Sequence, residues 1–257
     1  MGVVNVTPDS FSDGGRFLDP GSALAHARKL IEDGADLIDV GGESTRPGAA
    51  PVSEDEELAR VLPLLESLRD AAIPISVDTR RARVMREALG AGASMINDVE
   101  ALESSGAHQA MAASDCAVCL MHKKGDPATM QRDPQYADVV VEVKEYLSAR
   151  IGAAEQAGIA RHRIVIDPGF GFGKTPAHNL ELLRRLKEFR SLGVAVAAGW
   201  SRKSTLGVIT GKPVEQRLAA SIAAALLAVQ HGAHILRVHD VAETRDALAV
   251  WEALNTR

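Results

Sequence analysis

Polar and charged side chains stand at the ends of eight short apolar runs along this chain of 257 residues. In chain order they are Asn5, Asp39, Asp78, Asn97 with Asp98, His122, Asp167, Ser201-Arg202-Lys203, and Arg237 with His239. One such residue is usually a helix cap or a turn residue. Eight polar ends that converge on one face of a fold are typical of an active site.

The acidic members of this set come mainly from the middle of the chain and include Asp39, Asp78 and Asp167. A carboxylate deep inside a protein is costly unless it is paired or hydrogen-bonded. A flat ligand with amidine-like N–H groups would satisfy such carboxylates with two bonds each. The pattern therefore indicates that part of the ligand is a nitrogen heterocycle.

The basic members come late in the chain and are Arg202, Lys203, Arg237 and His239. In an eight-stranded barrel, the ends of the last two strands usually form the phosphate site. Asn5, on the first strand, is then their neighbour. A neutral oxygen ligand beside phosphate groups suits Mg²⁺, which keeps most of its waters. We therefore expect a phosphate group and a magnesium ion bound through Asn5.

The stretch IVIDPGFGFGKT ends in Gly-Lys-Thr, as a nucleotide-binding P-loop does. A P-loop needs glycine at its first position, where this chain has Pro168, and Pro176 follows the motif directly. Nucleotide binding is therefore disfavoured. We expect instead that Asp167 contacts the ring, that the glycines let the ligand approach the backbone, and that Phe170 or Phe172 forms an apolar wall.

The apolar runs are rich in Val, Ile and Ala, which predicts strands buried on both faces. They cover residues 3–6, 37–40, 73–77, 94–96, 117–121, 164–166, 194–198 and 235–238. Helical stretches alternate with them at 22–34, 53–68, 81–92, 106–113, 137–158, 179–189, 214–232 and 241–254. This alternation favours an α/β fold, a single (β/α)8 TIM barrel over residues 1–257, rather than an open doubly wound sheet.

Two long loops follow the first and second predicted strands, at 6–17 and 41–53, and both are rich in Gly, Pro, Ser and Thr. They exceed the usual βα connection, so we expect mobile loops that close over the site. Simple surface connectors are the alternative. Phe11 and Arg46 favour a binding role, because a connector needs neither an aromatic ring nor a base.

The bulk composition excludes several classes of protein. A net charge of -5 and a pI near 5.9 disfavour general nucleic-acid binding. No apolar run approaches the ~20 residues of a membrane span, and no leader opens the chain, so we expect a cytoplasmic protein. Cys116 and Cys119 lie in an apolar strand-like run with only His122 near, which predicts reduced structural cysteines.

Eight motifs, in order and at suitable intervals, resemble those of the dihydropteroate synthase family over essentially the whole chain. They are MGVVNVTPDSFSDGG, IDVGGESTRPGA, ISVDT, MINDV, MHKKGDPATMQ, IDPGFGFGKT, GWSRKSTLG and LRVHD. The resemblance implies a (β/α)8 barrel, usually a homodimer. It also implies an enzyme of folate synthesis that joins 6-hydroxymethyl-7,8-dihydropterin diphosphate to p-aminobenzoate and releases pyrophosphate.

The resemblance assigns roles to individual residues. The residues implied to hold the pterin ring are Asp78, Asn97, Asp167, Lys203 and Met121. Those implied for the diphosphate are Asn5, Arg237 and His239, with Mg²⁺ on Asn5 and a further substrate contact from Thr45. The p-aminobenzoate pocket is implied at Phe11, Arg46, Pro47, Phe172 and Ser204, and Asp39 is implied to support the ordered state of the loops.

The implied mechanism is substitution at the pterin methylene, with largely dissociative bond breaking. The residues implied to be catalytic are Asp78, Asp167, Lys203, Arg237 and His239. The bases and Mg²⁺ would stabilise the departing diphosphate, and the aspartates a pterin that becomes cationic. No general base is obvious, and an aniline nitrogen needs none. The loops would complete the second pocket after the pterin binds, so we expect ordered binding.

Two other functions remain open at this stage. A pterin methyltransferase domain that acts with a corrinoid protein would share the barrel and the acidic pterin edge, but it transfers no diphosphate. A non-catalytic pterin-binding homologue would be expected to lack a diphosphate or p-aminobenzoate residue. The late bases and the FSDGG and STRPG loops favour the synthase. Because the first loop has no insertion beside Phe11, we also expect sulfonamides to inhibit.

Overall fold

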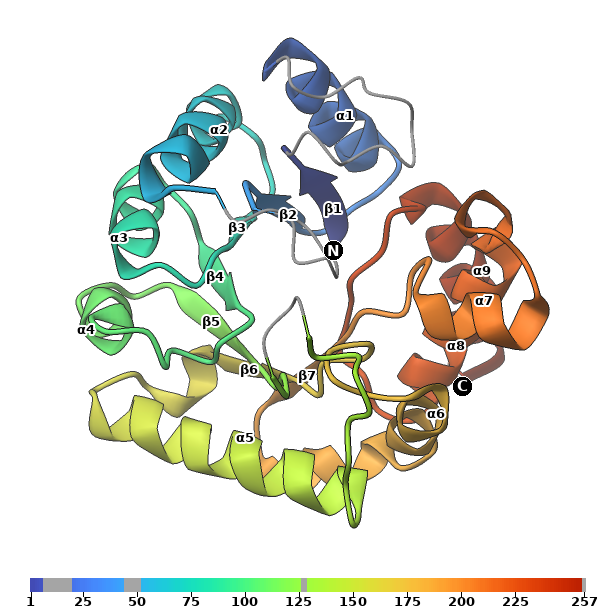
Figure 1. Ribbon diagram of the computed structural model, residues 1–257. Helices are drawn as coiled ribbons and strands as arrows, with labels where there is room; N and C mark the ends of the chain where they lie inside the picture. The colour runs from blue at the N-terminus through green and yellow to red at the C-terminus, as the bar shows by residue number, and fades with distance from the viewer. Residues whose placement is uncertain (7–19, 44–51, 126–128, 256–257) are drawn as a thin grey trace.

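The computed structural model describes residues 1–6, 20–43, 52–125 and 129–255. Within them, eight parallel strands pair in chain order from β1 to β8. The ring closes because the Val3 amide donates to the Val238 carbonyl (3.0 Å) and the Val238 amide donates to that of Met1 (2.9 Å). Figure 1 shows the strands around the centre and the helices outside them. The predicted (β/α)8 barrel is confirmed, and the open sheet is excluded.

The eight strands lie within two residues of the predicted runs. They are β1 (Gly2–Asn5), β2 (Ile38–Gly41), β3 (Ile75–Asp78), β4 (Met95–Asp98), β5 (Ala117–Met121), β6 (Ile164–Asp167), β7 (Ala195–Ala198) and β8 (Ile235–Leu236). Val, Ile and Ala suit them because each strand packs on helices with one face and into the barrel with the other. Inside the barrel, a small apolar cluster is formed by Met95, Cys119, Val165 and Ala197.

The helices surround this sheet. They are α1 (Pro20–Glu32), α2 (Glu54–Ser67), α3 (Ala82–Gly90), α4 (Ala107–Ala112), α5 (Val139–Gln156), α6 (Pro176–Arg184), α7 (Ser204–Thr210), α8 (Leu218–Gln230) and α9 (Val241–Asn255). Short 3-10 helices add η2 (Arg161–Arg163), η3 (Leu186–Leu192) and η4 (Val214–Gln216). The start of α2 follows the sequence signal, because the Ser53 hydroxyl accepts the Glu56 amide at 3.2 Å.

Three predicted helix boundaries were wrong. The helix expected at 179–189 begins earlier, at Pro176, since proline at the first helical position loses no intrahelical bond and Thr175 caps the end. It stops at Arg184, and η3 continues the segment as a 3-10 helix. The helix expected at 214–232 begins only at Leu218. Helix α7 was not predicted, because it is one of the shortest and contains a glycine.

Strand register sets the row of side chains at the carboxyl rim. Parallel pairing places Asn5 opposite Gly41, Gly41 opposite Asp78, and Asp78 opposite Asn97. Asp39 was expected at a strand end, but it lies two residues below Gly41 within β2 and is fully buried. The rim and the layer below it therefore both contribute polar groups to the same end of the barrel.

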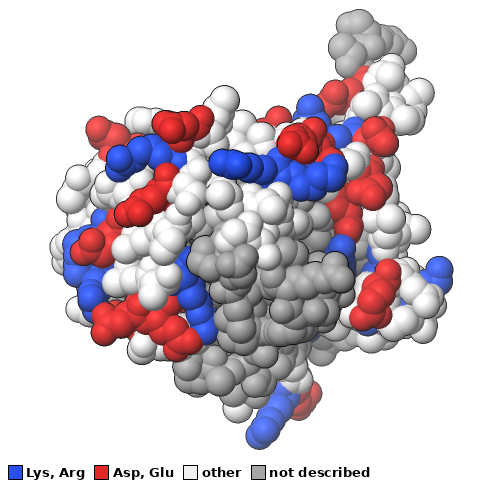
Figure 2. Space-filling model, turned by 90° about the horizontal axis from the view of Figure 1, so that it is seen from above, with Lys and Arg blue, Asp and Glu red and all other residues white. Residues whose placement is uncertain are grey.

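Three expectations drawn from composition concern the surface, the helices and the cysteines. Basic and acidic side chains are interspersed among the described residues of the face drawn in Figure 2. No helix in the described part of the chain is long and apolar enough to cross a membrane. Cys116 and Cys119 are both free thiols, and Cys119 is buried in the barrel.

Candidate active site

A pocket opens at the carboxyl ends of the strands and brings together most of the predicted pterin and diphosphate residues. Its lining includes Asp78, Asn97, Met121, Asp167, Phe172, Lys203, Arg237 and His239, with Phe170 and Ser201. Val99 and Gly199 also line it, and sequence reasoning did not single them out. Each directly follows a strand or its last polar residue, which is the signal that could have found them.

A buried ionic group forms the floor of this pocket. The Arg237 Nε donates to Asp39 Oδ2 at 2.7 Å, and its Nη2 donates to Asp78 Oδ2 at 3.1 Å. Asn97 Nδ2 adds a third contact, to Asp39 Oδ2 at 3.2 Å. Arg237 thus links β8 to β2 and β3 through two carboxylates.

The two carboxylates of this group are not equivalent. Burial raises the pKa of Asp78 to about 7; the Arg237 charge opposes the rise, and the nearby Asp39 charge adds to it. Asp39 is fully buried, and its Oδ1 has no hydrogen-bond partner among the described residues. Asp39 does not line the pocket, so Asp78 is the carboxylate of the floor that a ligand with N–H donors can reach.

Asp167 and Lys203 face the pocket from the other side. Burial raises the pKa of Asp167, while the Gly169 amide at 2.7 Å and the Lys203 charge oppose the rise. Burial lowers the pKa of Lys203 to about 8, so the lysine stays mainly charged at neutral pH. Its Nζ lies 4.3 Å from the centroid of the Phe172 ring. A cation and a carboxylate thus lie near an aromatic wall.

The Gly-Lys-Thr sequence is no phosphate cradle, because its lysine binds its own loop. Lys174 Nζ lies 2.9 Å from His122 Nδ1, 2.9 Å from the Gly169 carbonyl oxygen and 3.0 Å from that of Phe172. Gly169 has a φ of +71°, and a Cβ there would come within 1.9 Å of the His122 carbonyl oxygen. The glycines were predicted to let a ligand approach the backbone. At Gly169, the close approach is to the backbone of His122, which follows β5.

His122 takes part in this closure of the loop and does not line the pocket. Burial, followed by the Lys174 charge, lowers the pKa of His122 to about 3, so the ring is neutral and its Nδ1 accepts a hydrogen bond from Lys174 Nζ. The placing of His122 in the converging polar set was therefore wrong. Its position at the end of β5 was right, but its side chain serves the fold.

Comparison with known proteins shows the family to which this chain belongs. A model of the pterin binding enzymes matches residues 1–239. A dihydropteroate synthase from Haemophilus influenzae is 50% identical over 254 residues, which cover 98% of this chain and 92% of the relative. The chain belongs to the dihydropteroate synthase family of pterin-binding enzymes.

Solved structures of dihydropteroate synthases have the same fold. The enzyme of Xanthomonas albilineans, solved with 4-aminobenzoic acid, is 54% identical, has a TM-score of 0.94, and is matched over 100% of this chain and 93% of its own. The enzyme of Yersinia pestis, solved with a sulfonamide drug complex, is 46% identical, with a TM-score of 0.97 and coverage of 100% and 94%.

Two polar strand-end residues prove to be structural in this dihydropteroate synthase fold. Arg202, grouped with the phosphate bases, pairs with Asp240 at 2.6 Å and does not line the pocket. Asp98 accepts the amides of Glu100 (2.8 Å) and Leu102 (2.7 Å) and so caps the turn after β4. The acidic and basic groups of the pocket are correspondingly smaller than the sequence suggested.

The remaining predicted residues lie on the rim or outside the described ranges. Asn5 stands beside Gly41, and a Cβ on that glycine would lie 3.5 Å from Asn5 Oδ1. Ser204 is the exposed first residue of α7. The other p-aminobenzoate and substrate residues of the prediction lie outside the described residues, and these are Phe11, Thr45, Arg46 and Pro47. The predicted loops at 6–17 and 41–53 fall largely outside them as well.

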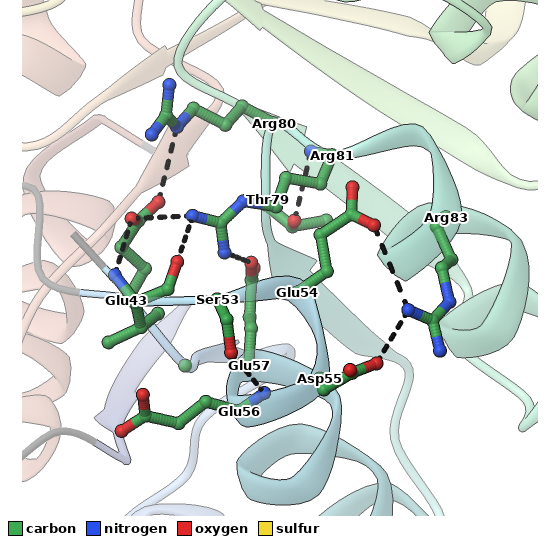
Figure 3. A network of polar contacts seen from close by, with 12 residues as sticks. Glu43, Ser53, Glu54, Asp55, Glu56, Glu57, Thr79, Arg80, Arg81 and Arg83 are labelled. Carbon is green, nitrogen blue, oxygen red and sulfur yellow. Dashed lines mark hydrogen bonds and ion pairs between the residues drawn. The ribbon is translucent and has the colours of Figure 1, made fainter.

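A second ionic group, the rim network, lies outside the pocket and was not predicted (Figure 3). It is centred on Arg81, which contacts Glu57 Oε2 at 2.6 Å, Glu43 Oε1 at 3.0 Å and the Val52 carbonyl oxygen. Arg80 joins the network through a second contact with Glu43, in which its Nε donates to Glu43 Oε2 at 3.2 Å. These contacts join the end of β2, the start of α2 and the connection from β3 to α3.

Proposed function

We propose that this protein is a dihydropteroate synthase, which condenses 6-hydroxymethyl-7,8-dihydropterin diphosphate with p-aminobenzoate to give 7,8-dihydropteroate and pyrophosphate. The observation that carries this function is that one pocket is lined both by carboxylates, Asp78 and Asp167, and by bases, Lys203, Arg237 and His239. A pterin diphosphate carries a donor-rich ring and a polyanion on one methylene, so it matches both kinds of group at once.

The carboxylates of the pocket would bind the pterin ring. Asp78, Asn97 and Asp167 offer acceptors to the ring N–H groups, and Met121 packs on its face. Ring donors would take the place of the Arg237 contact at Asp78, while the contact of Arg237 Nε with Asp39 keeps the guanidinium in the pocket. Both aspartates are then positioned to stabilise positive charge that develops on the pterin as the bond to the diphosphate breaks.

The bases of the pocket would bind the departing diphosphate. Arg237 and His239 both line the pocket just after β8, and Lys203 would lie near the ring carbonyl. A guanidinium binds phosphate through parallel N–H bonds, and donors that are in place before the reaction need no reorganisation. We therefore propose that these residues are catalytic in the sense that they stabilise the leaving group.

The residues present fit a magnesium ion beside the diphosphate. No cluster of three or more His, Cys, Asp or Glu in the described residues could hold a metal by itself. Asn5 Oδ1, on the rim next to Gly41, is a hard oxygen donor of the kind that a largely hydrated Mg²⁺ accepts. When bound there, the ion would offset charge on the departing diphosphate.

The second substrate would enter after the pterin. The Xanthomonas relative was solved with 4-aminobenzoic acid, which supports p-aminobenzoate as the nucleophile here. We propose ordered binding, because the predicted pocket includes Arg46, Pro47 and Phe11 from the two long loops. Calorimetric titration of p-aminobenzoate with and without pyrophosphate tests this. Equal affinities in the two titrations would refute ordered binding.

The reaction itself is tested by pyrophosphate release from the synthetic pterin diphosphate. We expect release only when p-aminobenzoate and Mg²⁺ are both present, and its near loss in Lys203→Ala. Binding of the pterin diphosphate without turnover under these conditions would instead support a non-catalytic pterin-binding homologue. The corrinoid-linked methyltransferase is disfavoured by the bases in the pocket, which that reaction does not need.

The Yersinia relative was solved with a sulfonamide drug complex, which supports the expectation that sulfonamides inhibit this enzyme. We expect sulfamethoxazole to compete with p-aminobenzoate in the release assay. Undiminished turnover at excess sulfamethoxazole would contradict this.

We also propose a homodimer, with residues 1–257 acting as one domain in the cytoplasm. Large apolar side chains exposed on α7 and α9 support an interface, since Val208 is 68% exposed and Leu254 is 80% exposed. Sedimentation velocity at several protein concentrations tests this assembly. A single monomeric species throughout would contradict the dimer. The cytoplasmic location stays a prediction.

A further inference from the structure

Ser201 and His239 form a pair between the segments that follow β7 and β8. The Ser201 Oγ accepts the backbone amide of His239 at 3.2 Å and lies 2.9 Å from the His239 Nδ1. Both residues line the pocket, and Ser201 is only 7% exposed. The resemblance that assigned His239 to the diphosphate gave Ser201 no role.

The position of the protons in this pair follows from the number of donors and acceptors. A serine hydroxyl has one proton to donate, and the Ser201 Oγ already accepts the His239 amide. Among the described residues, the acceptor recorded within reach of that proton is His239 Nδ1. If Nδ1 carried the proton instead, the buried hydroxyl would be left without an acceptor, which is costly. The hydroxyl therefore donates to Nδ1, and the ring proton resides on Nε2.

A neighbouring pair holds the same two segments together. Arg202 and Asp240, the residues that directly follow Ser201 and His239, form an ion pair at 2.6 Å. Arg202 has a φ of +59°, a backbone conformation that a residue other than glycine adopts only when its surroundings enforce it. The Arg202 amide also donates to Ser221 Oγ at 2.9 Å. These contacts fix Ser201 relative to His239 before any ligand arrives.

We propose that Ser201 is a positioning residue that holds His239 in the tautomer with the proton on Nε2. His239 then presents an N–H donor to an oxygen of the diphosphate without having to gain a proton or rotate first. This inference rests on the proposed function, because it takes the diphosphate as the partner of His239. The position of the proton does not depend on that function and can be measured separately.

The first measurement is nitrogen NMR of the imidazole of His239 in the ligand-free protein, assigned with His239→Gln. We expect wild type to show an unprotonated Nδ1 and a protonated Nε2. In Ser201→Ala we expect a mixture of the two tautomers, because the donor to Nδ1 is gone. A wild-type ring with its proton on Nδ1 would overturn the inference and leave the synthase function untouched.

The second measurement is the affinity for pyrophosphate with Mg²⁺, followed by the kinetics of the synthase reaction. For Ser201→Ala we expect affinity to fall by about three- to tenfold, the range for one hydrogen bond, and the KM for p-aminobenzoate to stay unchanged. Ser201→Thr, which keeps the hydroxyl, should restore the tautomer. An altered tautomer with unchanged pyrophosphate affinity would overturn the positioning role.

A matched serine separates this effect from a general loss of stability. Ser191 is exposed, and its hydroxyl donates to the Glu188 carbonyl at 2.8 Å within η3, none of whose residues lines the pocket. Ser191→Ala should leave both the His239 spectrum and the pyrophosphate affinity as in wild type. If wild type releases no pyrophosphate from the pterin diphosphate, the proposed function fails, whatever tautomer His239 adopts.

Discussion

The pocket floor and the rim network use the same chemistry for different ends. In each, one arginine lies between two carboxylates: Arg237 between Asp39 and Asp78, and Arg81 between Glu43 and Glu57. Asp78 lines the pocket, so a ligand can take over its contact with Arg237. Arg81 also donates a hydrogen bond to the backbone carbonyl of Val52, so its bonds hold chain segments together.

An arginine–carboxylate pair therefore does not identify a functional site by itself. Each group has one buried acceptor without a partner among the described residues, Asp39 Oδ1 in the floor and Glu57 Oε1 in the rim network. What distinguishes the pocket floor is that one of its carboxylates, Asp78, lines a cavity. The rim network also has a buried carboxylate, since burial raises the pKa of Glu57. That carboxylate belongs to a buried position of α2 and does not line the pocket.

The largest expected effect comes from removing the arginine of the pocket floor. Arg237→Met should lower kcat/KM for the pterin diphosphate by about 10³, because it removes a donor to the leaving group and leaves two carboxylates beside it. Steady-state pyrophosphate release measures this. A variant that folds and retains wild-type kcat/KM would show that the floor, like the rim, is only structural.

Removing the arginine of the rim network should act on stability. Arg81→Met leaves the buried Glu57 and Glu43 without their shared partner, which should lower the free energy of unfolding by about 3 kcal/mol. Urea unfolding followed by circular dichroism measures the change. The affinity for pyrophosphate should stay close to wild type. A large loss of that affinity with unchanged stability would reverse the distinction between the two groups.

The pH dependence of stability should report on the buried carboxylates of both groups, and Asp78→Asn isolates the part that comes from the pocket floor. The pKa of Asp78 is raised to about 7 in the folded protein, against about 4 for an unfolded aspartate, so the folded state binds the proton more tightly. Between about pH 5 and pH 7 the free energy of unfolding should therefore fall as pH rises. Asp78→Asn should flatten this slope in urea titrations. An equally steep slope in the variant would assign the effect to other buried acids.

The smallest effect is expected at the exposed edge of the rim network. Arg83 contacts Asp55 at 2.6 Å, but their side chains are 47% and 80% exposed. Arg83→Met should change the free energy of unfolding by less than about 1 kcal/mol, because water and salt screen an exposed pair. It is the matched control for Arg81→Met. A loss as large as that of Arg81→Met would mean that the network acts as one unit.

The strands and the pocket were predictable because both depend on local order along the chain. Short Val- and Ile-rich runs marked each strand, and the residue after each run marked the rim. Asp78 and Asn97 could be placed together in this way, and the register confirms that they are opposite each other.

Side-chain direction could not be predicted from position alone. His122 and Arg202 both follow strands, yet one turns to Lys174 and the other to Asp240. The rim network escaped prediction for a related reason. Glu43, Glu57 and Arg81 belong to three segments whose proximity exists only once α2 and α3 pack on the sheet. Helix α7 is short, so its sequence carries little periodic signal.

Closure of the barrel by β1 and β8 has a consequence during synthesis on the ribosome. The chain emerges from its N-terminus, so Asp39 and Asp78 are made long before Arg237, which follows the last strand. Until that strand leaves the exit tunnel, the two carboxylates lack their cation and β1 lacks its second neighbour in the sheet. The strand β8 and Arg237 therefore complete both the sheet and the charge balance of its interior.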